Sequence, residues 1–308
     1  MTRACATTLD AAAPRESGVG DGCAIRLGPY DVVVRGAHPQ ALADFAHLYS
    51  AQRIGALQQT ERIELEITRR SLGLGRSRYA IQCGDETIFS DLRSREVLPY
   101  LEWAVNYRFI ATCRRYLLLH AATVVWRGHG IVLVGSSGSG KSTLAAALAA
   151  RGGQYLCDEF AVIDPGELSI HPFPRALCVK SGSFAIMRAV GLPMWRRRCH
   201  VKAFKGRVGY VRPADLNAAT EPHAVDTIIL PRFTGATAPA MHEIPLSQAA
   251  FALAANALNA PDHARSTVDA MTQLAAQSVC RVLEVGDIHA TADLLERLII
   301  QRSYAQAG

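Results

Sequence analysis

The segment Gly135–Thr143 constrains the fold of this 308-residue chain most, because its sequence GSSGSGKST fits the pattern G-x-x-x-x-G-K-[ST] at every fixed position. The apolar run Gly130–Val134 before it predicts a buried strand, and the Ala- and Leu-rich run Thr143–Ala150 after it predicts a helix. A strand that delivers a glycine-rich loop to a helix N-terminus forms a cradle of backbone N–H groups for phosphate. A flexible linker would not be expected between such elements, so the segment predicts a nucleotide site.

Each residue type in this loop has an expected task. The glycines let the backbone curl so that N–H groups point inward, Lys141 would reach the β- and γ-phosphates, and the Ser142 hydroxyl would bind Mg²⁺. The residues expected to hold ATP and Mg²⁺ are Gly135, Ser136, Ser137, Gly138, Ser139, Gly140, Lys141, Ser142 and Thr143.

The strand before the loop has an expected antiparallel neighbour. The run Leu117–Trp126 predicts a strand, and a short turn at Arg127–Gly130 would return the chain along it. Nucleotide-binding folds of the doubly wound class instead place the loop strand in a parallel sheet. We therefore expect a mixed, largely antiparallel sheet of the α+β or α/β class. The same pairing would bring His120 to the loop, although a lone histidine beside a leucine run is more often a core residue.

Two carboxylates follow the loop helix. Asp158 and Glu159 stand at the end of the short apolar strand Tyr155–Cys157, where a returning strand would bring them beside bound phosphates. One carboxylate would hold Mg²⁺ and the other would accept a hydroxyl proton. Next to a phosphate loop, this pair favours phosphoryl transfer over the alternative of two exposed acids at a strand end.

Basic residues that could contact phosphate or an acidic substrate form two groups. Arg175 and Lys180 lie after the acids, and Lys205 and Arg207 lie in a predicted loop before the short strand Val208–Val211. A solvated surface explains such groups equally well. Because they match no groove-reading motif, we expect no nucleic-acid partner despite the net charge of +6.

The chain is expected to divide into three parts. Residues 1–22 have no apolar core of signal-peptide length and predict a disordered leader. Residues 23–115 predict a small α+β module, with a long helix over Leu98–Leu118 as a bridge, and residues 116–308 predict the phosphate-loop domain. Eight scattered cysteines and no apolar stretch of membrane-spanning length predict a cytoplasmic chain without a membrane partner.

The combination of His120, the loop Gly135–Thr143 and the pair Asp158–Glu159 resembles the HPr kinase/phosphorylase superfamily, in particular its HPr kinase-related group. The segments Leu101–Asn106 and Leu230–Phe233 are similar to that group as well. The resemblance implies a phosphate-loop kinase domain of the PEP carboxykinase-like type on a largely antiparallel sheet.

Carried over to this chain, the resemblance also implies catalytic roles. Asp158 would be the base for a serine hydroxyl, Glu159 would assist with the metal, and His120 would share the site with Lys141. Relatives that stand beside biosynthetic systems for ribosomally made peptides phosphorylate a serine of the precursor. The expected function is therefore an ATP-dependent serine kinase for a protein or peptide, with homo-oligomerisation left open. Two alternatives remain: a kinase of a small hydroxylated metabolite, and a nucleotide-binding regulatory module with little catalysis.

Overall fold

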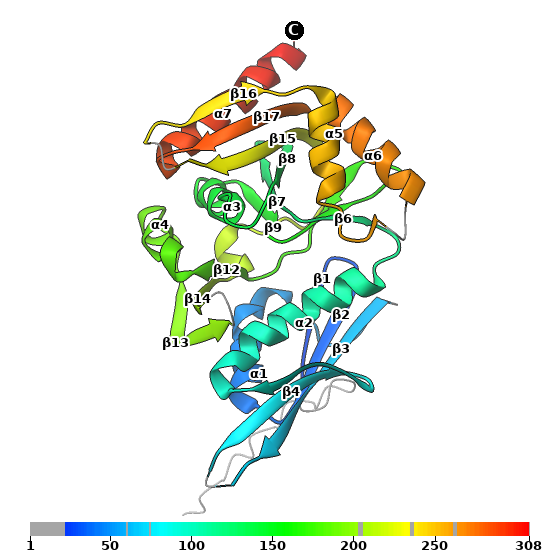
Figure 1. Cartoon of the computed structure of the whole chain (residues 1–308), viewed down its shortest axis with the longest axis vertical. Helices are drawn as coiled ribbons and strands as arrows, with labels where there is room; N and C mark the ends of the chain where they lie inside the picture. Colours follow the sequence, from blue (N-terminus) through cyan, green and yellow to red (C-terminus); the bar gives the residue numbers. More distant parts are fainter. Residues whose placement is uncertain are drawn as a thin grey trace, which may run out of the picture.

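The computed structural model describes residues 22–59, 61–73, 75–202, 206–234, 237–260 and 264–307, which form seven α-helices and three β-sheets (Figure 1). The predicted leader lies outside the described residues except for Gly22. None of the described helices is long and apolar enough to cross a membrane. The mixed α+β composition agrees with the predicted class.

The first sheet has the strand order β1-β2-β3-β4-β5. Its strands are Cys23–Leu27, Tyr30–Gly36, Glu61–Ser71, Ser77–Cys83 and Glu86–Leu92. β2 and β3 are parallel and are joined through α1 (Pro39–Leu48), whereas the other neighbours are antiparallel. Alternate residues of β3, such as Ile63 and Leu65, are buried, because successive side chains of a strand point to opposite faces.

Helix α2 (Val97–Thr112) follows this sheet and ends before the predicted position. The predicted helix over Leu98–Leu118 was wrong over residues 113–118, because the chain becomes extended at Cys113 and continues into the strand Leu117–Leu119. A distant side chain explains the change: Asn259 Nδ2 donates to the carbonyl oxygens of Cys113 at 3.2 Å and Tyr116 at 2.9 Å. Asn259 Oδ1 also accepts from the N–H of Leu118 at 2.9 Å, so one buried amide satisfies three backbone groups.

Replacing Asn259 with alanine is therefore expected to lower the free energy of unfolding by about 2 kcal/mol, because three buried backbone groups lose their partner. Urea denaturation of the purified chain measures this loss. The matched control is Asn256→Ala, which removes a single hydrogen bond to the Ala252 carbonyl within one helix turn. Equal losses of unfolding free energy in the two variants would show that the three hydrogen bonds of Asn259 contribute no more to stability than the one of Asn256.

The second sheet contains the strand that delivers the loop, β8 (His129–Val134). Its strand order is β6-β10-β11-β15-β8-β7-β9, with β17 and then β16 beside β15. The other strands are β6 Leu117–Leu119, β7 Ala121–Trp126, β9 Gln154–Cys157, β10 Ala161–Ile163, β11 Ser169–His171, β15 His223–Phe233, β16 Ala240–Glu243 and β17 Val279–Val285. β8 is antiparallel to β7 and parallel to β15, so the predicted mixed, largely antiparallel sheet is confirmed.

Helices cover both faces of this second sheet. On one face, Ile131 and Leu133 of β8 share a core with α3 (Lys141–Ala150) and α7 (Ile288–Ala307). On the other face, Val132 and Val134 share a core with α5 (Leu246–Ala255) and α6 (Ala264–Gln277). The loop strand is thus buried on both sides, which accounts for its unbroken apolar sequence.

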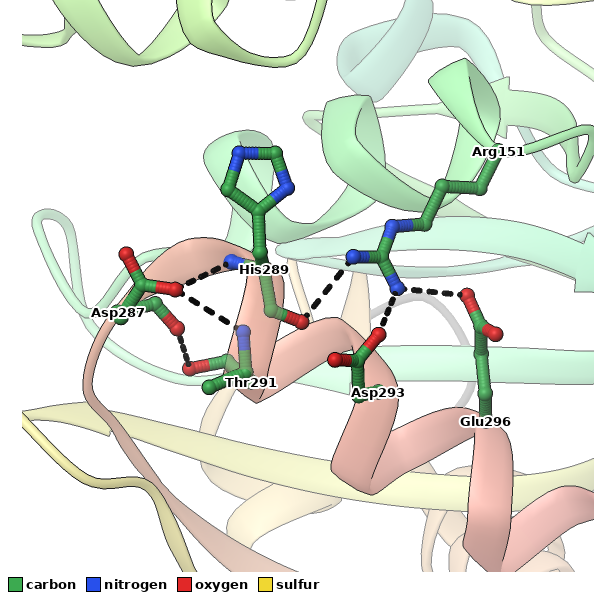
Figure 2. A network of polar contacts seen from close by, with 7 residues as sticks. Arg151, Asp287, His289, Thr291, Asp293 and Glu296 are labelled. Carbon is green, nitrogen blue, oxygen red and sulfur yellow. Dashed lines mark hydrogen bonds and ion pairs between the residues drawn. The ribbon is translucent and has the colours of Figure 1, made fainter.

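A polar network ties the end of α3 to α7 (Figure 2). The Arg151 guanidinium donates to the carboxylates of Asp293 and Glu296 and to the carbonyl of His289. Asp287 caps α7, since its Oδ1 accepts from the N–H of His289 at 3.0 Å. The helix that begins at the loop is therefore held at its far end by the C-terminal helix.

The third sheet lies beside α3 and has the order β12-β14-β13, with strands Leu177–Lys180, Gly206–Val211 and Trp195–Lys202. Leu177 and Val179 of β12 pack in one core with α3, and the short helix α4 (Phe184–Ala189) follows β12. Arg207 lies on β14, so its predicted place in a loop was wrong, and Lys205 lies outside the described residues.

One core also joins the first sheet to the rest of the chain. Phe109 of α2 stacks on Phe173 with ring centroids 4.0 Å apart and meets Phe160 edge-on at 5.4 Å. Tyr210 of β14 belongs to the same core. Residues before and after position 115 therefore contribute side chains to one common core. The domain boundary between residues 115 and 116 stays a prediction.

Candidate functional site

The loop after β8 has the backbone shape that its glycines allow. Gly138 and Gly140 have φ angles of 90° and 104°, in the left-handed region that residues with side chains rarely adopt. Gly140 is also the N-cap of α3, so the unpaired N–H groups of the first helical turn face the loop. This curled loop at a helix N-terminus fits a phosphate group, which supports the prediction for Gly135–Thr143.

A cavity of about 380 Å³ opens at this loop. Besides the loop residues Ser137, Gly138 and Gly140, predicted residues reach it from four further places in the fold. These are His120 between β6 and β7, Lys141, Ser142 and Thr143 at the start of α3, Asp158 and Glu159 after β9, and Lys180 at the end of β12. β6 and β7 are separate strands rather than the single predicted strand, and His120 lies between them. The pairing of Ala121 with Val134 then puts the preceding residue opposite the end of the loop strand.

Lys141 is held inside the loop by its ammonium group. Its Nζ donates to the carbonyl oxygens of Gly135 and Ser136 and lies 3.4 Å from Nε2 of His120. An ammonium group can only donate, so this contact favours the tautomer in which Nε2 accepts and Nδ1, which is 3.8 Å from Glu159 Oε2, carries the proton. Burial lowers the pKa of Lys141, while Glu159 and Asp158 act to raise it.

Asp158 is the most deeply buried acid of the cavity, with 3% of its surface exposed. The Tyr155 hydroxyl donates to its Oδ1 at 2.9 Å, and the Ser142 hydroxyl is a second partner. Burial, together with the adjacent Glu159, raises the pKa of Asp158 to about 7, although Arg175 and the two hydroxyls act to lower it. A carboxyl group with a pKa near neutrality can take up and release a proton under physiological conditions.

The donor set fits Mg²⁺ shared with a nucleotide. Mg²⁺ prefers oxygen ligands and is usually bound by one or two carboxylates together with water and substrate phosphates. The Ser142 hydroxyl and the Asp158 carboxylate are hydrogen-bonded beside the phosphate cradle, and Glu159 belongs to the same turn. Among the described residues, no three His, Cys, Asp or Glu side chains gather into a metal site of their own.

Of the described basic residues that were predicted to contact phosphate or substrate, only Lys180 lines the cavity. Its Nζ donates to the Ser137 hydroxyl at 3.4 Å. Arg175 is 2% exposed and pairs with Glu102 at 2.8 Å, so the prediction of a direct phosphate or substrate contact was wrong for this residue. Its guanidinium group acts electrostatically on Asp158 and Glu159 but does not line the cavity. Arg207 is exposed on β14 and does not line the cavity.

Two parts of the site were not predicted from the sequence. Tyr155 binds Asp158 from within β9, and the wall opposite the loop is built by Leu177, Val179 and Met187. A tyrosine three residues before a candidate base is a usable signal, because β9 and its turn keep the two side chains near each other. The sequence around Leu177, Val179 and Met187 has only the apolar pattern of an ordinary buried segment, so it does not indicate a cavity wall.

The raised pKa of Asp158 predicts that Asp158→Asn stabilises the metal-free, nucleotide-free chain at alkaline pH. Between the unfolded pKa of about 4 and the folded pKa of about 7, the folded chain holds a proton that the unfolded chain has lost, so wild-type stability falls as the pH rises. Asparagine has no charge to bury. We expect a gain on the order of 2 kcal/mol near pH 8 that shrinks towards about pH 5. Urea denaturation with a chelator present measures it, and a pH-independent difference would contradict the burial of this charge.

Comparisons with known proteins find a matching sequence family and similar solved structures, of which one is described below. Residues 95–191 match a sequence family described as SynChlorMet cassette protein ScmC. The matched segment is less than half of the chain and contains His120, the loop Gly135–Thr143, Asp158 and Glu159. No curated protein is significantly similar to the chain. A solved structure, the Hpr(Ser) kinase/phosphatase from Coxiella burnetii, is 18% identical over 62% of this chain and 99% of its own, with a TM-score of 0.28, which is too low to establish a shared fold.

Proposed function

We propose that the chain is an ATP-dependent serine kinase of the HPr kinase-like type, which acts on a protein or peptide. The observation that supports this most is the convergence of Lys141, His120 and Asp158 on one cavity at the N-terminus of α3. A phosphate cradle, a cation and a carboxylate that can accept a proton are three of the groups that phosphoryl transfer to a hydroxyl uses. The choice of serine in a polypeptide rests on the resemblance of these residues to the HPr kinase-related group.

In the proposed reaction, the serine oxygen forms a bond to the γ-phosphorus of ATP while the bond from this phosphorus to the bridging oxygen breaks, and ADP leaves. Ionised Asp158 accepts the hydroxyl proton of the serine. The Lys141 ammonium exchanges the carbonyl oxygens of Gly135 and Ser136 for phosphate oxygens and balances their negative charge. Ser142 and Glu159 would hold Mg²⁺, which would supply further positive charge at the phosphates, and Asp158 is left to accept the proton.

His120 has an orienting task in this proposal. It stands between the Lys141 ammonium at 3.4 Å and the Glu159 carboxylate at 3.8 Å. One imidazole ring therefore contacts both a cation and an anion of the cavity and can orient them relative to each other. Lys180, at the end of β12, adds a second cation next to Ser137 of the loop.

The proposal is tested with the purified chain, Mg²⁺ and γ-labelled ATP. The acceptors are a serine peptide library, a matched library with alanine in place of each serine, and a pool of small hydroxylated metabolites. We expect label in the serine library alone, and mass spectrometry identifies the modified residue. Label in the metabolite pool alone would point to a metabolite kinase. Tight nucleotide binding without any labelled product would favour a regulatory module.

A further inference from the structure

A buried ion pair lies behind the acids of the candidate site. Arg175 Nη2 donates to Glu102 Oε2 at 2.8 Å, and each side chain is 3% exposed. Tyr49 completes the group: its hydroxyl donates to the same Glu102 oxygen at 2.8 Å and accepts from the N–H of Ala176 at 3.1 Å. Glu102 belongs to α2 and Tyr49 follows α1, so both helices of the N-terminal part hold the segment that carries Arg175.

This segment runs beside the strand that ends in the acids. The N–H of Phe173 donates to the carbonyl of Leu156 in β9 at 3.1 Å, which fixes the backbone around Arg175 next to the turn at Asp158. The guanidinium charge acts on both acids across this short separation. Burial acts to lower the pKa of Arg175, but Glu102 and Tyr49, followed by Asp158 and Glu159, raise it well above its usual value.

Helix α2 makes a second contact with the same turn. Phe109, two helical turns after Glu102, contacts the rings of both Phe173 and Phe160, which also contact each other. Phe160 is the residue directly after Glu159, and its N–H donates to Cys157 Sγ at 3.4 Å to close the turn. One face of α2 therefore contacts both the turn that carries the acids and the segment that carries the arginine.

Stability alone does not account for an ion pair at this place. Removing two charges from water has a large energetic cost, and well-packed apolar residues of similar volume usually stabilise a protein as well or better. We propose that Arg175, held by Glu102 and Tyr49, is a positioning residue for the turn Cys157–Phe160, so that α1 and α2 set the geometry of the acid pair. This inference rests on the proposed function, in which the acid pair serves as base and metal ligand.

The double variant Glu102→Met with Arg175→Met tests the inference without leaving one buried charge alone. We expect it to fold, with kcat for phosphoryl transfer lower by about 10- to 100-fold and with unchanged KM for ATP and unchanged nucleotide affinity, because a small displacement of catalytic groups affects the chemical step. The conservative variant Arg175→Lys keeps the positive charge and is expected to retain more activity than the double variant.

Arg151→Met is the matched control. This arginine also joins two elements through carboxylates, but at the far end of α3 (Figure 2). We expect its removal to leave kcat unchanged. A loss of kcat as large as that of the double variant would mean that any lost tie between elements disturbs the reaction, and the inference would be wrong.

Hydrogen–deuterium exchange gives a second readout that does not depend on activity. In the double variant, we expect faster amide exchange in the turn 157–160 and unchanged exchange in α3. A folded double variant with wild-type kcat and wild-type exchange overturns the inference, as does a rise in KM that parallels the loss of kcat. If wild-type chain transfers no phosphate, the kinase proposal fails and the exchange result alone decides the positioning of the turn.

Tyr49→Phe serves if the double variant does not fold. It removes only the hydroxyl that contacts Glu102 and the N–H of Ala176, and the phenyl ring keeps its packing against Phe45. We expect a few-fold lower kcat, faster exchange in the turn 157–160, and the same nucleotide affinity. Unchanged kcat and unchanged exchange in this folded variant would likewise overturn the inference.

Discussion

Replacing Lys141 with methionine is expected to lower the rate of phosphoryl transfer by about 10²- to 10³-fold, the size of effect seen when one charge-stabilising group is removed from an active site. The ammonium is placed by the loop carbonyls of Gly135 and Ser136 and has only a short distance to cover to reach a phosphate in the cradle. Methionine keeps the aliphatic stem of the side chain but supplies no charge. Initial rates of label transfer from γ-labelled ATP measure the loss.

The stability of the Lys141→Met chain separates a catalytic loss from misfolding. Burial lowers the pKa of Lys141, because removing the ammonium from water costs free energy in the folded chain. Its replacement should therefore not lower the melting temperature. Nucleotide affinity is expected to fall together with the rate, because the ammonium contacts phosphate in the ground state as well. If the Lys141→Met chain transfers phosphate at the wild-type rate, Lys141 has no role in the reaction.

Replacing Asp158 with asparagine is expected to lower the same rate by about 10²- to 10⁴-fold, the range associated with loss of a positioned general base. Asparagine has nearly the same shape and can still accept from the Tyr155 hydroxyl, but it cannot take up the serine proton. The affinity for metal-free ADP should not fall, because an ionised carboxylate only accepts hydrogen bonds and makes none with phosphate oxygens. Steady-state rates with the serine peptide library, together with calorimetric titration of ADP, give both quantities.

Asp164→Asn is the matched control for this substitution. Asp164 also stands in a turn after a short apolar strand, but its Oδ1 accepts from the N–H groups of Gly166 and Glu167 in the β10–β11 turn. The control should keep the wild-type rate. Similar rate losses in both variants would indicate that general loss of acidic charge, rather than the base at Asp158, is responsible.

The local parts of the site were predictable because their signals lie in consecutive residues. The loop Gly135–Thr143, the strand before it and the helix after it follow from one short pattern, and the acids follow from a strand that ends at Cys157. His120 was predictable through one further step, the hairpin between β7 and β8, since a tight turn fixes the register of its two strands.

The long-range parts were not predictable in the same way. Glu102 and Arg175 are 73 positions apart, and no periodicity in either segment indicates that they pair in the core. The sequence position of Arg175 alone therefore predicts a phosphate contact rather than a buried ion pair. The end of α2 was missed for a similar reason, because the amide that holds Cys113 comes from Asn259, 146 positions later.

A single-turnover experiment examines the proposed kinase site most directly. Wild-type chain in excess over γ-labelled ATP, with Mg²⁺ and the serine peptide library, should convert the bound nucleotide to ADP and phosphoserine in equal amounts. The Lys141→Met and Asp158→Asn chains should form little phosphoserine in the same time. If wild-type chain binds the nucleotide but forms no phosphoserine, or if it forms phosphoserine as fast without Lys141 and Asp158, then this cavity is not a serine-kinase site.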